Sequence, residues 1–141
     1  MEVNYESHCF THTISEDMPV FPGSETPKLT TKSTYEKDGF KETLLQMYSH
    51  VGTHMDPPAH IFANQKTLDQ FSPEQFIGKA LVVDCRDLKE GQVIAMDKIN
   101  IDKAKLADFL LFNLGWDKHF KDETYFNDFP YNSRKLQRHW L

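Results

Sequence analysis

The chain has 141 residues, of which 39% are hydrophobic and 26% charged, and its formal net charge is −5. This length fits one domain with a buried core, and the composition is ordinary for a globular protein. The acidic balance and the absence of a basic stretch argue against a nucleic-acid partner. The first residues lack the basic and apolar regions of a signal peptide, and no apolar run is long enough to cross a bilayer. We therefore expect a cytoplasmic protein with no membrane partner.

The first half of the chain has the pattern of β-strands. Residues 28–35 and 40–51 each alternate polar and apolar or threonine-rich positions, and Asp38-Gly39 between them is a strong hairpin signal. The segment Met18-Pro19-Val20-Phe21-Pro22-Gly23 precedes this hairpin and has the composition of a turn. The sequence thus predicts an antiparallel front half.

The second half predicts a crossover unit. Ser72-Pro73-Glu74 has the composition of a helix start, for a short helix that ends near Gly78. The continuous apolar runs at 80–84 and 110–114 are typical of strands buried on both faces, and a helix is expected late in residues 96–109. Strand, helix and strand in this order favour parallel pairing. The expected fold class is therefore α/β with a mixed sheet.

The end of the chain predicts one more helix. Asn132 or Ser133 would cap it, and Leu136 and Trp140 would share one face. No closing strand follows, so the helix is either the last element or part of a domain that is incomplete at its C-terminus. The two cysteines, Cys9 and Cys85, form no CxxC motif, and we expect two buried thiols in a reducing compartment.

Three of the seven histidines fall within eleven residues, together with an aspartate. The run is His50-Val51-Gly52-Thr53-His54-Met55-Asp56-Pro57-Pro58-Ala59-His60. Its glycine and prolines argue against a helix, and in an extended chain the four even-numbered candidates share one face. Two imidazoles four residues apart would be about 13 Å apart in a straight strand, too far for one ion at about 2.1 Å. We therefore expect a bend at Gly52, which can take backbone angles closed to other residues.

Two imidazoles and one carboxylate leave positions open on a metal, which is typical of a catalytic site rather than a structural one. The ligand set suits zinc, manganese or iron, and ligand softness does not choose among them. His60 is either a further ligand or a group that transfers a proton to or from the activated water. We interpret the other four histidines, His8, His12, His119 and His139, as structural, with His119 on a solvated face among charged residues.

The run matches every fixed position of the motif HxGTHxDxPxH, and in this it resembles the putative cyclase family, which includes bacterial kynurenine formamidases and isatin hydrolases. Flanking segments are similar to the family as well: residues 18–23, Lys66-Thr67-Leu68-Asp69, Phe76-Ile77-Gly78 and Leu114-Gly115-Trp116. The resemblance covers nearly the whole chain.

The resemblance implies a single domain over residues 1–141, with the family's swivelling β/β/α architecture and assembly into dimers or tetramers. It implies that His50, His54 and Asp56 bind the metal, that Asp56 can bridge two ions, and that His60 is the catalytic acid and base. It places Phe21 near the substrate pocket. Cys9 stands where the family usually has an aspartate. Two-metal members take a further histidine and glutamate from a C-terminal region that this chain does not include, so a second metal stays open.

These features predict a metal-dependent hydrolase of arylformamidase type, in which metal-activated water attacks a small-molecule formamide, cyclic amide or ester. Zinc is the expected ion, with manganese as the alternative. An iron oxygenase using His54, Asp56 and His119 would leave His50 and His60 without a role. A non-catalytic metal-binding domain, or an inactive fragment, is the other alternative. The apolar residues around Phe21 and in the last helix predict a homo-oligomer.

Overall fold

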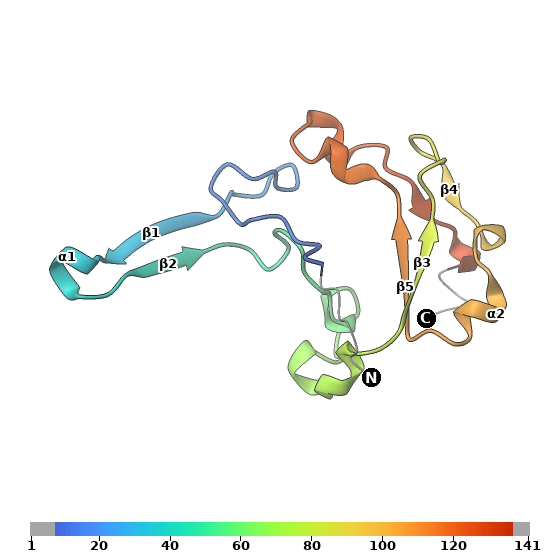
Figure 1. The fold of residues 1–141 in the computed structure, drawn as a ribbon, viewed down its shortest axis with the longest axis horizontal. Coiled ribbons are helices and arrows are strands. Elements are labelled where there is room, and N and C mark those ends of the chain that lie inside the picture. The colour runs from blue at the N-terminus through green and yellow to red at the C-terminus, as the bar shows by residue number, and fades with distance from the viewer. Residues whose placement is uncertain (1–7, 137–141) are drawn as a thin grey trace, which may run out of the picture. The chain divides into compact units, whose positions relative to one another are not determined.

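The computed structural model describes residues 8–136, and the chain divides into two units, one that ends at Met55 and one that begins at Asp56. Figure 1 shows the elements in chain order. No helix within residues 8–136 is both long and apolar enough to span a membrane. The strands, helices and 3-10 turns are β1 (Lys28–Ser33), α1 (Tyr35–Asp38), β2 (Glu42–Gln46), η1 (Pro58–His60), η2 (Leu68–Gln70), η3 (Pro73–Phe76), β3 (Ala80–Asp84), β4 (Val93–Ile94), η4 (Met96–Lys98), α2 (Ile101–Ala104), β5 (Phe109–Asn113), η5 (Trp116–His119), η6 (Glu123–Phe126) and β6 (Tyr131–Asn132).

The first unit contains the predicted antiparallel hairpin. β1 pairs with β2 in the register Lys28↔Gln46 to Ser33↔Glu42, with one irregularity near the turn. The connection is the helical turn α1, which Gly39 ends in the left-handed region at φ 77° while its N–H donates to the Tyr35 carbonyl. A left-handed residue at this position favours glycine, which explains the Asp38-Gly39 signal.

The second strand is shorter than the sequence predicts. β2 ends at Gln46 rather than continuing to Val51. The next residue of the partner strand beyond Lys28 would be Pro27, which has no N–H to donate to the ladder. Pairing therefore stops there, and the chain leaves the hairpin before the histidine motif at residues 50–60.

The second unit contains the predicted crossover. β3 and β5 pair in parallel, from Ala80↔Phe109 to Asp84↔Asn113. The helix between them is a single turn, α2, whose N-cap Asn100 accepts a hydrogen bond from the Lys103 N–H. The helix predicted at Ser72-Pro73 is the 3-10 turn η3, with proline in its first turn, and it ends at Phe76 instead of near Gly78.

One face of the parallel pair is buried and the other is not. Val83 and Cys85 belong to the core, which also contains Ile94, Ile99, Ala104 and Leu136. Val82 on the opposite face is 60% exposed, and Leu111 is 46% exposed. The expectation of strands buried on both faces is therefore wrong for this chain.

The predicted last helix begins as expected. The Ser133 hydroxyl accepts a hydrogen bond from the Leu136 N–H at 3.1 Å, and Leu136 is 3% exposed. Trp140 lies outside the described residues. Of the two thiols predicted to be buried, Cys85 is buried and Cys9 is exposed, so the expectation for Cys9 is wrong.

Candidate metal centre

The motif segment begins at a buried anchor within the first unit. Val51 is 4% exposed and Met18 is 3% exposed. Gly52 takes φ 70°, and a Cβ there would lie 3.5 Å from the Met18 Cε. The predicted bend at Gly52 is therefore confirmed. The bend occurs where only glycine is unstrained, beside a methionine that packs closely against it.

His54 is oriented by the backbone of the same bend. Its Nδ1 lies 2.8 Å from the Gly52 carbonyl oxygen, and its Nε2 lies 3.0 Å from the His50 Nδ1. A carbonyl only accepts, so the His54 Nδ1 carries the proton and its Nε2 keeps a lone pair for a ligand. A hydrogen bond from the distal ring nitrogen to a backbone carbonyl is typical of metal-binding histidines.

The separation of the two imidazoles fits a shared ion. Two nitrogens that each bind one ion at about 2.1 Å lie about 3.0 Å apart at a right angle and about 3.4 Å apart in a tetrahedron. The observed 3.0 Å between His50 Nδ1 and His54 Nε2 is in this range. The rings meet edge to face, with centroids 4.9 Å apart.

The conformations of Pro57 and Pro58 position His60. Pro57 is extended at ψ 161°, and Pro58 opens the 3-10 turn η1, in which the His60 N–H donates to the Pro57 carbonyl at 2.9 Å. The turn is held from the post-motif segment, because the Ala59 N–H donates to the Lys66 carbonyl at 3.1 Å. A proline at the first position of a turn costs no hydrogen bond.

The turn brings His60 back toward the other candidates. One potential ligand atom from each of His50, Asp56 and His60 lies within 4.8 Å of the other two, and all three residues are exposed. Two atoms that share an ion at about 2.1 Å are at most about 4.2 Å apart, so small side-chain rotations would close this group around one ion. His54 contacts the group through His50. All four predicted residues therefore lie together in one short segment, and the donor set of imidazoles and a carboxylate fits a divalent ion.

Phe21 and His119 lie outside the motif segment, and their surroundings differ; His139 lies outside the described residues. Phe21 is 62% exposed, and its carbonyl accepts a hydrogen bond from the Ser24 N–H. His119 is not on a solvated face as expected. Its ring lies 4.5 Å from that of Trp116, and its Nδ1 lies 3.2 Å from the Asp122 Oδ2. The spacing of Trp116, His119 and Asp122 by three residues is the sequence signal that would have shown this.

Comparison with solved structures finds proteins of similar fold. The chain is similar to a crystal structure of an isatin hydrolase bound to the product analogue thioisatinate, with a TM-score of 0.75 and 20% identity over 93% of this chain and 61% of that one. It is similar to isatin hydrolase A from Ralstonia solanacearum, with a TM-score of 0.71 and 20% identity over 89% of this chain and 58% of that one. A third structure, described as a potential metal-dependent hydrolase with cyclase activity, gives a TM-score of 0.67 and 24% identity over 92% and 59%.

This chain thus covers 58–61% of the length of these three solved structures. At these identities the likeness concerns the fold, and it confirms the mixed α/β class. Comparison with curated protein sequences gives no match. The family model described as Putative cyclase matches residues 10–141, which include the whole motif, most of the first unit and all of the second. The chain is therefore a member of the Cyclase family.

Proposed function

We propose that this chain is a metal-dependent hydrolase whose ion is held by His50, His54 and Asp56. The observation that carries the proposal is the grouping of these residues and His60 in one segment that Gly52 bends and Pro58 turns back. Family membership supports the same reaction class, since the similar structures are described as isatin hydrolases and as a potential metal-dependent hydrolase.

The proposed reaction cleaves a formamide, a cyclic amide or an ester, as in an arylformamidase. A divalent ion, when bound, lowers the pKa of water toward neutrality and polarises a carbonyl group. The Gly52 carbonyl holds His54 in the tautomer that leaves Nε2 available. His60, at the end of η1, would take a proton from the attacking water and deliver it to the leaving nitrogen or oxygen. Zinc and manganese both suit this ligand set.

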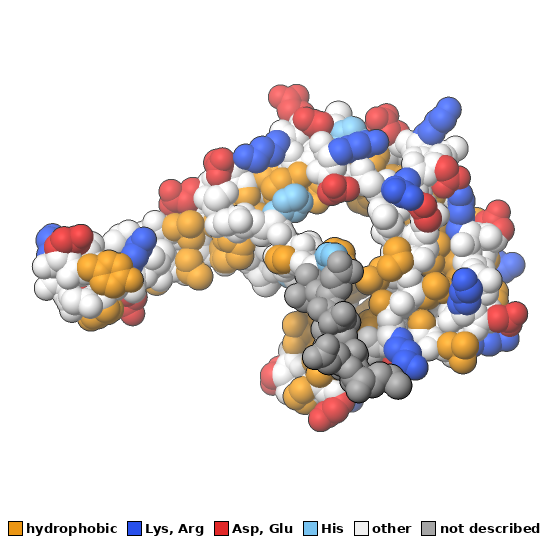
Figure 2. All heavy atoms as spheres, viewed as in Figure 1, with side chains coloured by type: hydrophobic (Ala, Val, Ile, Leu, Met, Phe, Trp, Pro, Cys, Tyr) orange, Lys and Arg blue, Asp and Glu red, His pale blue; other side chains and the backbone are white. Residues whose placement is uncertain are grey.

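The proposal includes an assembly. Four large apolar side chains of the hairpin, Tyr35, Phe40, Leu44 and Leu45, are 49–69% exposed. Figure 2 shows hydrophobic side chains on the surface of this hairpin, at the left of the view. An isolated two-stranded hairpin is only marginally stable, and exposed apolar surface favours association. We therefore propose a cytoplasmic homo-oligomer of single-domain subunits in which Phe21 lines the substrate pocket.

The test of function measures turnover with defined ions. The purified chain is stripped with chelator, reloaded with zinc or manganese, and assayed on an aryl formamide, isatin and an aryl ester. The proposal predicts ion-dependent hydrolysis of at least one of these compounds. His60→Ala should retain the ion and lose about 10²–10⁴-fold in rate, because proton transfer typically contributes that much. His12→Ala is the matched control and should keep full rate.

Two results would contradict this assignment. A chain that binds the ion and hydrolyses none of the three compounds would be a non-catalytic metal-binding domain. Loss of the ion in His60→Ala together with its retention in His54→Ala would make His60 the ligand and His54 the candidate for proton transfer. Both results are measurable on the same protein preparations.

A further inference from the structure

A crevice of about 530 Å³ opens between the two loops that leave the carboxyl ends of β3 and β5. Each loop contributes three lining residues, which are Leu88, Lys89, Glu90, Trp116, Lys118 and His119. Ligands of open α/β sheets bind outside the carboxyl ends of parallel strands, and pockets for small molecules have about 300–1,000 Å³. Both the place and the size therefore fit a small-molecule site.

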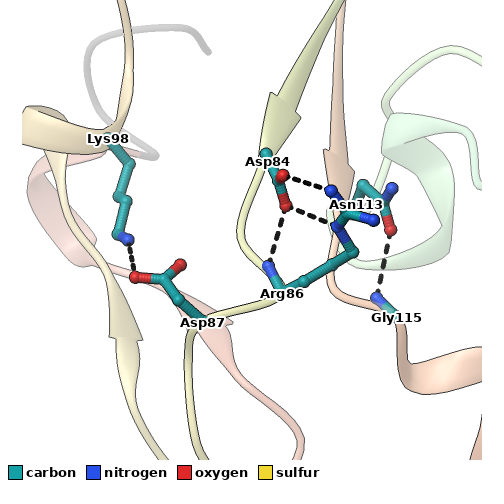
Figure 3. Close-up of polar contacts among 6 residues, drawn as sticks. All are labelled: Asp84, Arg86, Asp87, Lys98, Asn113 and Gly115. Carbon is teal, nitrogen blue, oxygen red and sulfur yellow. Dashed lines mark hydrogen bonds and ion pairs between the residues drawn. The ribbon is translucent and has the colours of Figure 1, made fainter.

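Hydrogen bonds hold the first residues of both loops in place (Figure 3). Arg86 donates from Nε and Nη2 to the two carboxylate oxygens of Asp84 at 2.9 and 2.6 Å. The Gly115 N–H donates to the Asn113 Oδ1 at 3.1 Å. Gly115 takes φ 60°, and a Cβ there would lie 3.3 Å from the Arg86 Cγ. The first loop thus packs directly on the start of the second.

The wall of the crevice is aromatic and held in place. Trp116 Nε1 donates to the Tyr125 carbonyl at 2.9 Å, which fixes the indole. The His119 ring lies against the indole with centroids 4.5 Å apart, and its Nδ1 lies 3.2 Å from the Asp122 Oδ2. Two fixed rings offer a stacking surface without an ordering cost on binding. Leu88 adds apolar surface beside them.

The charge of the lining favours a monoanion. Lys89 and Lys118 carry positive charges and Glu90 carries one negative charge, so these three side chains give the lining a net charge of +1. Within residues 8–136, neither ammonium group forms an ion pair. An ammonium group beside an aromatic surface recognises a carboxylate on a planar ring.

We propose that this crevice binds a small planar aromatic carboxylate. The ring would stack beside Trp116 and His119, and the carboxylate would be held by Lys89 and Lys118. None of the lining residues belongs to the motif segment at residues 50–60, and the proposal does not depend on the hydrolase activity.

The test uses calorimetric titration with benzoate. The titration is performed on a His50→Ala/His54→Ala background, so that a metal at the motif cannot bind the carboxylate. We expect saturable binding that weakens at least tenfold in the further variant Lys89→Gln/Lys118→Gln. The matched control, Lys103→Gln/Lys105→Gln, removes the same charge from α2 and the residue after it, and should leave binding unchanged. Circular dichroism verifies that each variant is folded.

Two further ligands test the recognition chemistry. Cyclohexanecarboxylate, which has the charge without the aromatic ring, should bind several-fold more weakly than benzoate. Inorganic phosphate should not compete. Absence of saturable benzoate binding, equal weakening by both lysine pairs, or equal affinity for all three ligands would each overturn the proposal.

Discussion

Gly78 precedes β3 at a place where the structure leaves no room for a side chain. A Cβ at this position would lie 2.6 Å from both the Cβ and the Oδ2 of Asp108. Non-bonded carbons ordinarily approach to about 3.5 Å, so the backbone itself must move. The Asp108 carboxylate accepts the Lys79 N–H at 2.8 Å, and the Lys79 carbonyl accepts the N–H groups of Asp108 and Phe109. This junction sets the start of the parallel pair.

Gly78→Ala should therefore destabilise the fold strongly. Forced overpacking costs about 1–3 kcal/mol, and weakening a hydrogen bond to a charged acceptor adds about 1 kcal/mol at this exposed position. The expected loss is about 2–4 kcal/mol, which lowers the urea midpoint by about 1–2 M. Urea unfolding followed by far-ultraviolet circular dichroism measures it, at a fixed protein concentration.

Two variants separate steric cost from other effects of an added methyl group. Gly91 has φ 69° and nothing within 4 Å of an added Cβ. Gly91→Ala should therefore lower the free energy of unfolding by only about 1 kcal/mol, because it adds backbone strain but no clash. Gly78→Ala/Asp108→Gly removes the clashing side chain and should regain the part of the loss that the clash causes. A Gly78→Ala protein within about 0.5 kcal/mol of the wild type would refute this reasoning.

Three further predictions concern single side chains. Cys9 is exposed, and the Thr11 hydroxyl lowers the pKa of its thiol, whereas burial raises the pKa of the Cys85 thiol; iodoacetamide should label Cys9 in the folded protein and Cys85 only on unfolding, and equal rates would contradict this. The Arg86 side chain holds the pKa of Asp84 well below its usual range, so this pair contributes stability above about pH 4 that is lost as the pH falls. In Asp84→Asn the free energy of unfolding should therefore fall less steeply as the pH is lowered below about 4. An unchanged pH dependence would refute a contribution of this pair to stability. Ser133→Ala should cost about 1 kcal/mol in urea unfolding, since the hydroxyl caps the last helix; no loss would exclude the cap.

The sequence predicted the elements better than their lengths. The alternating front half predicted the hairpin, and the two apolar runs predicted the parallel pair. Alternation with a period of two and short apolar runs are both typical of β-strands. The crossover helix α2 is a single turn, although apolar residues lie on both sides of it. Ile99, before the helix, is buried in the core, whereas Leu106, two residues after it, is 79% exposed. An apolar composition alone does not show where a helix ends.

The motif predicted the course of residues 50–60 in similar detail. The bend at Gly52 followed from the reach of two imidazoles, and φ 70° confirms it. The sequence predicted His60 on the same face as the other candidates, but it did not predict the turn at Pro58. The 3-10 turn that Pro58 opens brings His60 back toward the other candidates, and this turn depends on a hydrogen bond from the Ala59 N–H to the Lys66 carbonyl. Such a contact outside the motif cannot be seen in a pattern of alternating positions.

The crevice beside Trp116 was missed for the same kind of reason. The charged neighbours of His119 indicated a surface position, although its spacing of three residues from Trp116 and from Asp122 also fits the observed contact with the indole. Its lining residues come from two loops that are remote in sequence and meet because β3 and β5 are adjacent. Parallel pairing could be predicted from the sequence, but the side chains that meet at its end could not.

The metal content of the purified chain tests the central claim most directly. After exposure to excess zinc or manganese and removal of free ion, elemental analysis should find one divalent ion per chain in the wild type and in His12→Ala. His50→Ala/His54→Ala and Asp56→Ala should each lose it, because both remove donors that the bent segment brings together. A folded His50→Ala/His54→Ala protein that keeps a full equivalent of the ion would contradict the account.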